Sequence, residues 1–218
     1  FAAADQRGER AQAIAQDVHD PHALATLYAT LAQTREEQGD FEGALTYARH
    51  GLEVQERIGR KRDVGSSWNT IGWVHTKRGN FTKAEEALAN AERIASEVAD
   101  ERLLAYVQQT RAEMALARGR FNEAIELAES SIRNPAASGR CRAGSLLVRA
   151  QAIAKTDAAP GAVNAAFAEA ITALEPLGRR MLAAAYRAQF QALLDRGEAP
   201  AANRAAQRAL ELAQPSLG

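Results

Sequence analysis

The stretch RGNFTKAEEALANAE, from Arg78 to Glu92, decides the fold of this chain. A Gly-Asn-Phe turn at residues 79–81 opens it, and small residues follow at Ala84 and Ala91. The same pattern stands forty residues earlier and forty residues later, with Gly39, Phe41, Ala44 and Gly51 in one copy and Gly119, Phe121, Ala124 and Ser131 in the other. A fixed period of roughly 20–50 residues marks a repeat architecture. We therefore expect a chain of similar units.

Each unit is expected to be a pair of helices. In the second unit the first helix should run from about Asp63 to Arg78, and Gly79 should end it, because glycine accepts the left-handed backbone of a helix stop. Phe81 then begins a second helix. Its buried stripe has helical spacing and consists of Ala84, Leu88, Ala91 and Ile94. The small residues let two helices approach closely, so the pattern predicts an all-α fold.

Composition excludes several classes of protein. The chain has 218 residues, a formal net charge of +0 and a hydrophobic content of 46%. A balanced charge argues against direct nucleic-acid binding, which usually needs a basic excess. No apolar run approaches the roughly 20 residues of a membrane span. The single cysteine, Cys141, fits a reducing compartment and is interpreted as a small buried residue. We therefore expect a cytoplasmic protein that binds no membrane.

Motifs for catalysis or for metal and cofactor binding are not found in the sequence. It contains no glycine-rich phosphate loop, no Gly-x-Ser-x-Gly elbow and no His-Glu-x-x-His or Cys-x-x-Cys motif. The stretch His19-Asp20-Pro21-His22 is better explained by an aspartate cap and a proline at a helix start. The basic run at residues 60–62 indicates a loop or a helix start. We expect no enzyme activity, no catalytic residues, no metal and no cofactor.

The motif resembles the tetratricopeptide repeat (TPR). The second unit carries the family's pattern as Trp68, Ile71, Gly72, Gly79, Phe81, Ala84 and Ala91, and the first carries it as Tyr28, Leu31, Ala32, Gly39, Phe41, Ala44 and Gly51. The third unit keeps only its turn and Ala124. The fourth has a turn at residues 157–161 without Gly-x-Phe, and the fifth has Phe190 where a small residue is usual. The resemblance implies a right-handed α-solenoid of antiparallel helix pairs.

The period sets the expected boundaries. Residues 1–20 are interpreted as a half repeat, because Phe1, Ala4 and Ala11 fall on the turn and small positions. Five full repeats follow at residues 21–60, 61–100, 101–139, 140–178 and 179–218, which makes about 11 helices in a single solenoid. The half repeat also suggests a fragment cut from a longer protein; a processed N-terminus with a capping helix is the alternative. Proline at residue 215 should stop the last helix.

In the family, the first helix of each repeat lines a concave groove. The matching positions are Thr26, Thr30, Gln33 and Glu37, then Ser66, Asn69, Thr70, Trp73 and Lys77, then Tyr106, Gln109, Thr110 and Glu113, then Ser145, Arg149 and Lys155, and finally Arg187, Gln191 and Asp195. From these we select eight partner-binding candidates: Gln33, Asn69, Trp73, Tyr106, Gln109, Glu113, Arg149 and Arg187. The family's carboxylate-clamp pattern is not reproduced.

Five of the candidates have a specific expected role. Asn69 and Gln109 share one slot, and a side-chain amide offers a donor and an acceptor to a peptide backbone. Trp73 is a candidate hot spot, and Arg149 and Arg187 could hold a carboxylate or phosphate. The alternatives are that polar residues here are merely solvated, that Trp73 packs under a neighbouring helix, and that Arg149 pairs with a nearby acid.

Repeats of about 40 residues exceed the usual 34 of the family. They resemble the sensor regions of large bacterial transcription activators and of peptide-pheromone receptors from Gram-positive bacteria. The resemblance implies a non-catalytic module that binds a protein or peptide and belongs to a larger regulatory protein. The alternative is a scaffold or oligomerisation element whose groove holds no ligand and which binds its own kind.

Overall fold

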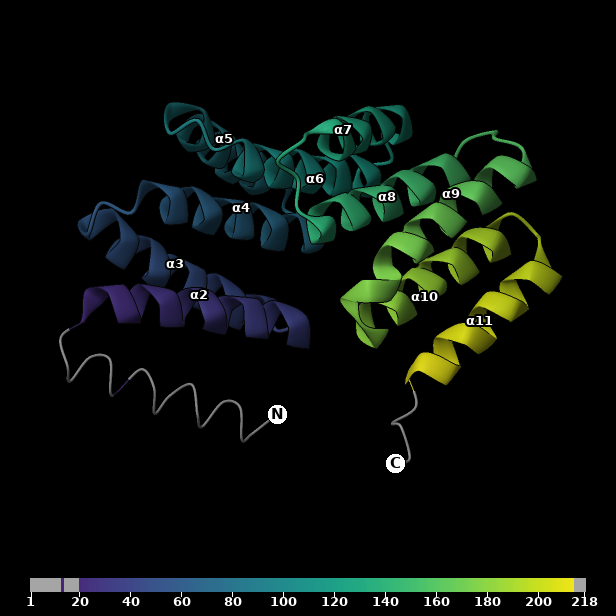
Figure 1. The fold of residues 1–218 in the computed structure, drawn as a ribbon, viewed down its shortest axis with the longest axis horizontal. Coiled ribbons are helices and arrows are strands. Elements are labelled where there is room, and N and C mark those ends of the chain that lie inside the picture. Colours follow the sequence, from purple (N-terminus) through teal and green to yellow (C-terminus); the bar gives the residue numbers. More distant parts are fainter. Residues whose placement is uncertain (1–12, 14–19, 214–218) are drawn as a thin grey trace. The chain divides into compact units, whose positions relative to one another are not determined.

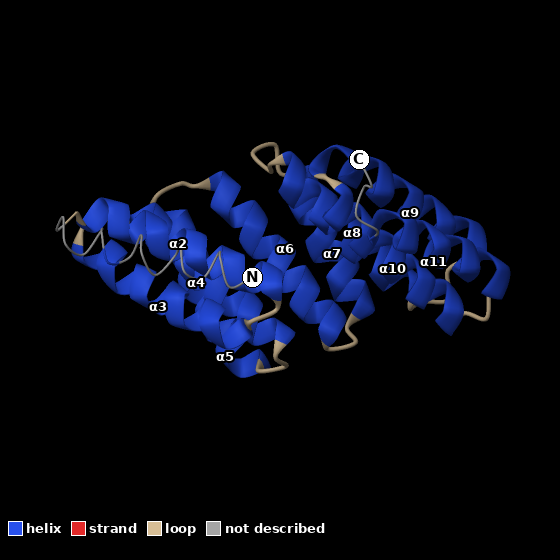
Figure 2. Cartoon of the chain, turned by 90° about the horizontal axis from the view of Figure 1, so that it is seen from below, coloured by secondary structure: helices blue, strands red, loops and turns tan. Residues whose placement is uncertain are grey.

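The computed structural model describes residue 13 and residues 20–213, and this part of the chain is helical throughout, without a strand. Short turns join the helices (Figures 1 and 2). They are α2 (Pro21–Gln38), α3 (Phe41–Arg57), α4 (Lys61–Lys77), α5 (Phe81–Glu97), α6 (Glu101–Ala117), α7 (Phe121–Arg133), α8 (Gly139–Ala154), α9 (Pro160–Leu174), α10 (Arg179–Asp195) and α11 (Ala199–Ala213), with a short 3₁₀ turn, η1 (Glu175–Leu177). The prediction of an all-α fold is confirmed.

The helices follow the expected repeats in pairs. The helices form the successive pairs α2/α3, α4/α5, α6/α7, α8/α9 and α10/α11, which recur about every 40 residues, while the predicted bounds of the repeats stay a prediction. The predicted half repeat at residues 1–20 and the proline stop at residue 215 lie outside the described residues. The chain forms two compact units, one ending at Thr110 and the other beginning at Arg111. The course of a single right-handed solenoid over residues 1–218 stays a prediction.

Glycine ends the first helix of several pairs, as expected. Gly79 has φ +72°, in the left-handed region that only glycine adopts without strain. Its N–H donates to the Thr76 carbonyl over 3.0 Å, and the Asn80 N–H donates to the His75 carbonyl over 2.9 Å. These bonds satisfy carbonyls that the end of α4 would otherwise leave without partners. Gly39, Gly119 and Gly197 adopt the same conformation in their own turns.

Small residues bring α4 and α5 together. Ala84 and Ala91 are fully buried, as are Leu88 and Ala95 on the same stripe of α5. A methyl group on Gly72 would lie 2.7 Å from the Leu88 Cγ and 3.4 Å from the Ala84 carbonyl oxygen. Burying a leucine of this kind stabilises a fold by about 1.5–3 kcal/mol. The stripe predicted for α5 is confirmed, and its glycine partner explains why both helices tolerate so little bulk.

The first helix of the second repeat differs slightly from expectation. The sequence predicted a start near Asp63, whereas α4 begins at Lys61 with Arg60 as its N-cap residue. Gly59, at φ +72°, makes the turn one residue earlier. Arg60 and Asp63 then form an ion pair across the first turn, which favours helix there. The basic run is therefore a helix start, one of its two expected interpretations.

Asp20 begins α2 as a cap. Its carboxylate accepts hydrogen bonds from the backbone N–H groups of His22 at 2.9 Å and Ala23 at 3.1 Å, and Pro21 occupies the first helical position. The explanation of this stretch as a cap is confirmed. Among the described residues, histidine, cysteine, aspartate and glutamate nowhere gather in a group of three or more that could hold a metal ion.

The fourth repeat replaces the glycine turn with a contact from the next repeat. Arg196, directly after α10, donates from Nη1 to the carbonyls of Ala154 at 3.2 Å and Thr156 at 3.1 Å. Its Nη2 donates to the Ala158 carbonyl at 2.5 Å. These carbonyls belong to the turn between α8 and α9, the segment that lacks Gly-x-Phe. One guanidinium thus satisfies three carbonyls that the local sequence does not cap.

Cys141 lies fully buried in the second unit, at the start of α8. Its sulfur is 3.5 Å from the Ser131 hydroxyl, which in turn accepts from the Ser145 hydroxyl at 2.9 Å. The interpretation of Cys141 as a small buried residue is confirmed. None of the helices that the structure describes combines the length and apolar character needed to cross a membrane.

Candidate functional site

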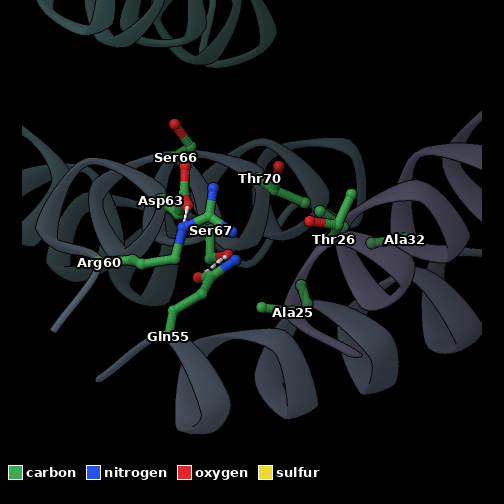
Figure 3. A pocket seen from close by; sticks show the side chains of 11 residues that line it. Ala25, Thr26, Ala32, Gln55, Arg60, Asp63, Ser66, Ser67 and Thr70 are labelled. Carbon is green, nitrogen blue, oxygen red and sulfur yellow. Dashed lines mark hydrogen bonds and ion pairs between the residues drawn. The ribbon is translucent and has the colours of Figure 1, made fainter. Parts of the chain in front are cut away.

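A cavity of about 190 Å³ opens between α2, α3 and α4 in the first unit (Figure 3). We call it the α2–α4 cavity. Its lining consists of Ala25, Thr26, Ala29, Ala32, Ala48, Gln55, Arg60, Asp63, Ser66, Ser67 and Thr70. Thr26 and Ser66 occupy the same slot in successive repeats, forty residues apart, and both are among the groove positions that the TPR resemblance implied. The cavity therefore lies on the face formed by the first helices of two repeats.

Alanines create the space. Ala25, Ala29 and Ala32 lie on one side of α2, and Ala48 on α3 adds a fourth short side chain. Where larger side chains would interdigitate, these methyl groups leave a gap between helices that are otherwise closely packed. Ala29 is exposed at the rim, whereas the other three are buried.

A buried polar pair lies among the alanines. Gln55 is 2% exposed and Ser67 is 7% exposed. The Ser67 hydroxyl donates to the Gln55 Oε1 over 2.8 Å (Figure 3). Within the described residues, the Gln55 amide nitrogen donates no hydrogen bond to the protein. Polar groups this deeply buried are rarely placed without full partners, so the amide nitrogen is the notable feature of the cavity.

Two hydroxyls of the lining have already used their hydrogens. Thr26 donates to the His22 carbonyl over 3.0 Å, and Ser66 donates to the Arg62 carbonyl over 3.1 Å. Each hydroxyl oxygen therefore presents lone pairs but no free hydrogen. At one end of the cavity, Arg60 and Asp63 form their ion pair and offset each other's charge. The cavity has a polar lining without a net charge.

Asn69 and Trp73 lie on α4 but do not line this cavity. The Asn69 Oδ1 is buried and accepts no hydrogen bond from the part of the chain that the structure describes. Trp73 is half-buried: its ring meets Phe41 edge-on at a centroid distance of 6.1 Å, and the Lys77 ammonium lies 5.2 Å from the ring centroid. The alternative that Trp73 packs against a neighbouring helix thus has a specific contact, while part of the ring stays accessible.

The other candidates fall into two groups. In the first unit, Gln33 is exposed, and Tyr106 and Gln109 are half-buried. In the second unit, Glu113 and Arg149 are half-buried and Arg187 is exposed. Arg149 forms an ion pair with Glu169 on α9, which is the local pairing weighed above as its alternative. The partner-binding role of all eight candidates stays a prediction.

Sequence analysis missed the residues that give the cavity its polar interior. Gln55 occupies the slot of Ala95 in the next repeat, and Ser67 occupies the slot of Val107. Both partners of the hydrogen bond are therefore polar where the following repeat is apolar. A comparison of buried slots between repeats would have singled them out.

A buried histidine, His75, lies on α4 outside the cavity. His75 is 5% exposed, and burial lowers its pKa below the ordinary value; Arg49, Lys83 and Arg78 lower it further, and Glu42 acts in the opposite direction. The imidazole is therefore held in its neutral form.

Comparison with known proteins agrees with these repeats. A family model described as tetratricopeptide repeat matches residues 63–135. The crystal structure of BtubC (BKLC) from P. vanneervenii is similar, with a TM-score of 0.64, 18% identity, and coverage of 97% of this chain and 88% of that one. At this identity the likeness concerns the fold alone. No curated protein matches the sequence. The match shows that residues 63–135 carry tetratricopeptide repeats, and they lie in a chain whose helix pairs recur about every 40 residues.

Proposed function

We propose that this chain is a protein-interaction module and that an extended segment of a partner binds across α2 and α4 of the first unit. The observation that carries the proposal is the α2–α4 cavity, which opens between residues in equivalent slots of two successive repeats. Tetratricopeptide repeats generally bind protein partners and are generally not catalytic. A partner lying across several first helices would contact the same slot in each of them.

Two further features support this surface. Asn69 is half-buried on α4, one helical turn before Trp73, and its amide nitrogen can donate to a backbone carbonyl of a bound segment. Trp73 is fixed by Phe41 and Lys77 and still exposes part of its ring. An aromatic side chain already held in place loses little conformational freedom on binding, and this suits a hot spot.

The proposal extends to the larger protein. The long repeats resemble those in sensor regions of bacterial transcription activators and pheromone receptors, which supports a ligand-sensing role within a cytoplasmic regulatory protein. In such an array each helix pair contacts its neighbours, so small rotations can add up. A ligand that bridges two first helices would favour one arrangement of the pairs over another. The regulatory activity that responds to the ligand would then reside in a different part of that protein.

Selection of peptides from a random library on the immobilised chain, followed by calorimetry with the selected peptide, tests the proposal. Trp73→Ala should weaken binding at least about tenfold, which corresponds to about 1.4 kcal/mol, and Asn69→Ala should weaken it by a smaller factor. Thr46→Ala, on an exposed position of α3, is the matched control. Circular dichroism would verify that each variant is folded. Unchanged affinity in both test variants would contradict binding at this surface.

Exposed apolar side chains on the last helix pair favour the scaffold function as a second candidate. Leu194 is 48% exposed and Leu210 is 65% exposed, which is unusual for large apolar residues here. If they mediate self-association, light scattering coupled to size-exclusion chromatography should detect a dimer or larger species. The double variant Leu194→Ser and Leu210→Ser should then be monomeric. A monomeric wild-type chain over micromolar concentrations would eliminate this candidate.

A further inference from the structure

We propose that the α2–α4 cavity selects a primary carboxamide, the side chain of an asparagine or glutamine in the bound segment. This inference rests on the proposed function, since the cavity would receive one side chain of the partner. It follows from the hydrogen-bonding groups that line the cavity, from their charge balance and from the size of the space.

The donors and acceptors of the cavity match both ends of an amide. The Gln55 Oε1 accepts from Ser67, so the Gln55 amide nitrogen is left to donate to a ligand oxygen, and the Thr70 hydroxyl can donate beside it. The oxygens of Thr26, Ser66 and Ser67 have each committed their hydrogens, to His22 O, Arg62 O and Gln55 Oε1 respectively. They can only accept from a ligand. A primary carboxamide supplies an acceptor oxygen and two donor hydrogens in one planar group.

Other polar side chains satisfy only half of this arrangement. An ionised carboxylate carries no hydrogen to donate to the hydroxyl oxygens, and an ammonium group cannot accept from Gln55. Arg60 is the cation nearest to the cavity, but Asp63 is paired with it and would repel a second carboxylate. Burying a charge here would also cost more than burying a neutral amide. The lining therefore favours a neutral group over either ion.

The space fits a side chain of this kind. A volume of about 190 Å³ accommodates a glutamine side chain, and the methyl groups of Ala25, Ala29, Ala32 and Ala48 provide apolar contact for its methylenes. Gln55 reaches toward Ser67 within the same cavity, and the hydrogen bond between them is visible in Figure 3. A glutamine side chain that enters between α2 and α4 would place its terminal amide at the Gln55–Ser67 pair and its methylenes against the alanines.

Three small probes test the selectivity without knowledge of the partner: the N-acetyl methylamides of glutamine, glutamate and alanine. Each is titrated at pH 7 into the ¹⁵N-labelled chain, and the side-chain amide signal of Gln55 is followed by NMR. The glutamine probe should shift this signal saturably. The glutamate probe should bind at least about tenfold more weakly. The alanine probe, which has only backbone amides, should leave the signal unchanged.

Variants locate the binding. Ala29→Leu places a larger side chain at the exposed rim and should abolish the shift. Thr26→Val keeps the shape of the side chain, removes one acceptor and should weaken binding severalfold. Ala89→Leu adds the same bulk as Ala29→Leu at an exposed position outside the cavity and should leave binding unchanged. Thermal unfolding of each variant would show that the loss of binding does not reflect loss of the fold.

The outcomes separate this inference from the proposed function. Equal or tighter binding of the glutamate probe, an equal shift with the alanine probe, or no shift with any probe would each overturn carboxamide selection. If a selected peptide still binds the first unit and loses affinity with Trp73→Ala, the interaction surface stands while the selectivity fails. If the glutamine probe binds but no peptide does, the cavity is specific for an amide and the partner-binding proposal fails instead.

Discussion

The second and fourth repeats reach the same helix pair by different means. In α4/α5 the turn is local. Gly79 takes the left-handed conformation, and the backbone N–H groups of Gly79 and Asn80 donate to carbonyls at the end of α4. In α8/α9 no such glycine stands in the turn, and Arg196 from beyond α10 satisfies three carbonyls there. The second repeat holds its shape through its motif, whereas the fourth relies on a contact from the following repeat.

The difference extends to the contact between the two helices. Gly72 and Ala84 let Leu88 pack directly against α4, so the close approach depends on residues without bulk. In the fourth repeat, Phe167 is fully buried, and Val163 and Ala150 are buried with it in one cluster. In the fourth repeat the large Phe167 side chain fills the space between the helices, whereas in the second repeat Gly72 and Ala84 allow the helices to approach closely. Degeneracy of the motif therefore does not imply a loosely packed repeat.

The largest effect is expected from bulk at the small position of the second repeat. Ala84→Leu should lower the free energy of unfolding by about 1–3 kcal/mol, because the added atoms have no space between α4 and α5. Urea denaturation measures the change. Ala89→Leu, an exposed position on the same helix, should have little effect. If both variants unfold at the same denaturant concentration as the wild type, the assigned helix packing is wrong.

A somewhat smaller effect is expected from the long-range contact of the fourth repeat. Arg196→Met keeps the aliphatic stem and removes the guanidinium, so the turn carbonyls lose their donors, at a cost of about 1–2 kcal/mol. Hydrogen exchange should become faster mainly at the end of α8 and the start of α9. Arg140→Met, an exposed arginine of the same unit, serves as the control. Uniformly faster exchange over the whole unit would mean that Arg196 does not act on this turn.

Acid should destabilise the second repeat through His75. Its pKa is lowered in the folded chain by burial and by Arg49, Lys83 and Arg78, whereas the unfolded chain binds a proton near the ordinary value of about 6.5. The unfolded state therefore takes up the proton first as the pH falls. The contribution of the neutral imidazole to the free energy of unfolding is fully present above about pH 7. It decreases as the pH falls below about 6.5 and stops decreasing once the pH is below the lowered pKa of His75 in the folded chain.

The variant His75→Gln should remove this part of the pH dependence. Thermal unfolding of wild type and variant between pH 8 and pH 5 should diverge only on the acidic side. His50→Gln replaces an exposed histidine of the same unit that lies against Tyr28, and it is the matched comparison. A wild type whose stability relative to His75→Gln is constant over this range would contradict a lowered pKa.

The smallest effect concerns the turns between repeats. Gly59 and Ala99 occupy equivalent positions and both have positive φ, +72° and +50°. Alanine is strained there, so Ala99→Gly should raise the free energy of unfolding by up to about 1 kcal/mol, partly offset by the greater freedom of glycine in the unfolded chain. Gly59→Ala should change stability in the opposite direction. A loss of stability in Ala99→Gly would show that chain entropy outweighs the strain.

The helix pairs could be predicted because their signals are local. The period of the glycine turns, the Asp20 cap and the stripe on α5 depend on residues within one or two turns of helix, and all three are confirmed. The start of α4 was misplaced by two residues, because the helix includes part of the basic run at residues 60–62, which the sequence left as either a loop or a helix start. Family resemblance also marked Thr26 and Ser66 as groove positions, and both line the cavity.

The amino-acid sequence by itself determined the fold class and the period of the helix pairs, since periodicity, capping and turn conformation depend on neighbouring residues along the chain. Only the tertiary structure decided that Gln55 and Ser67 form a buried pair, that four alanines leave a cavity above it, and that Arg196 completes a turn about forty residues upstream. Such contacts join different helices, and their donors, acceptors and empty space are set by how side chains from separate helices pack against each other.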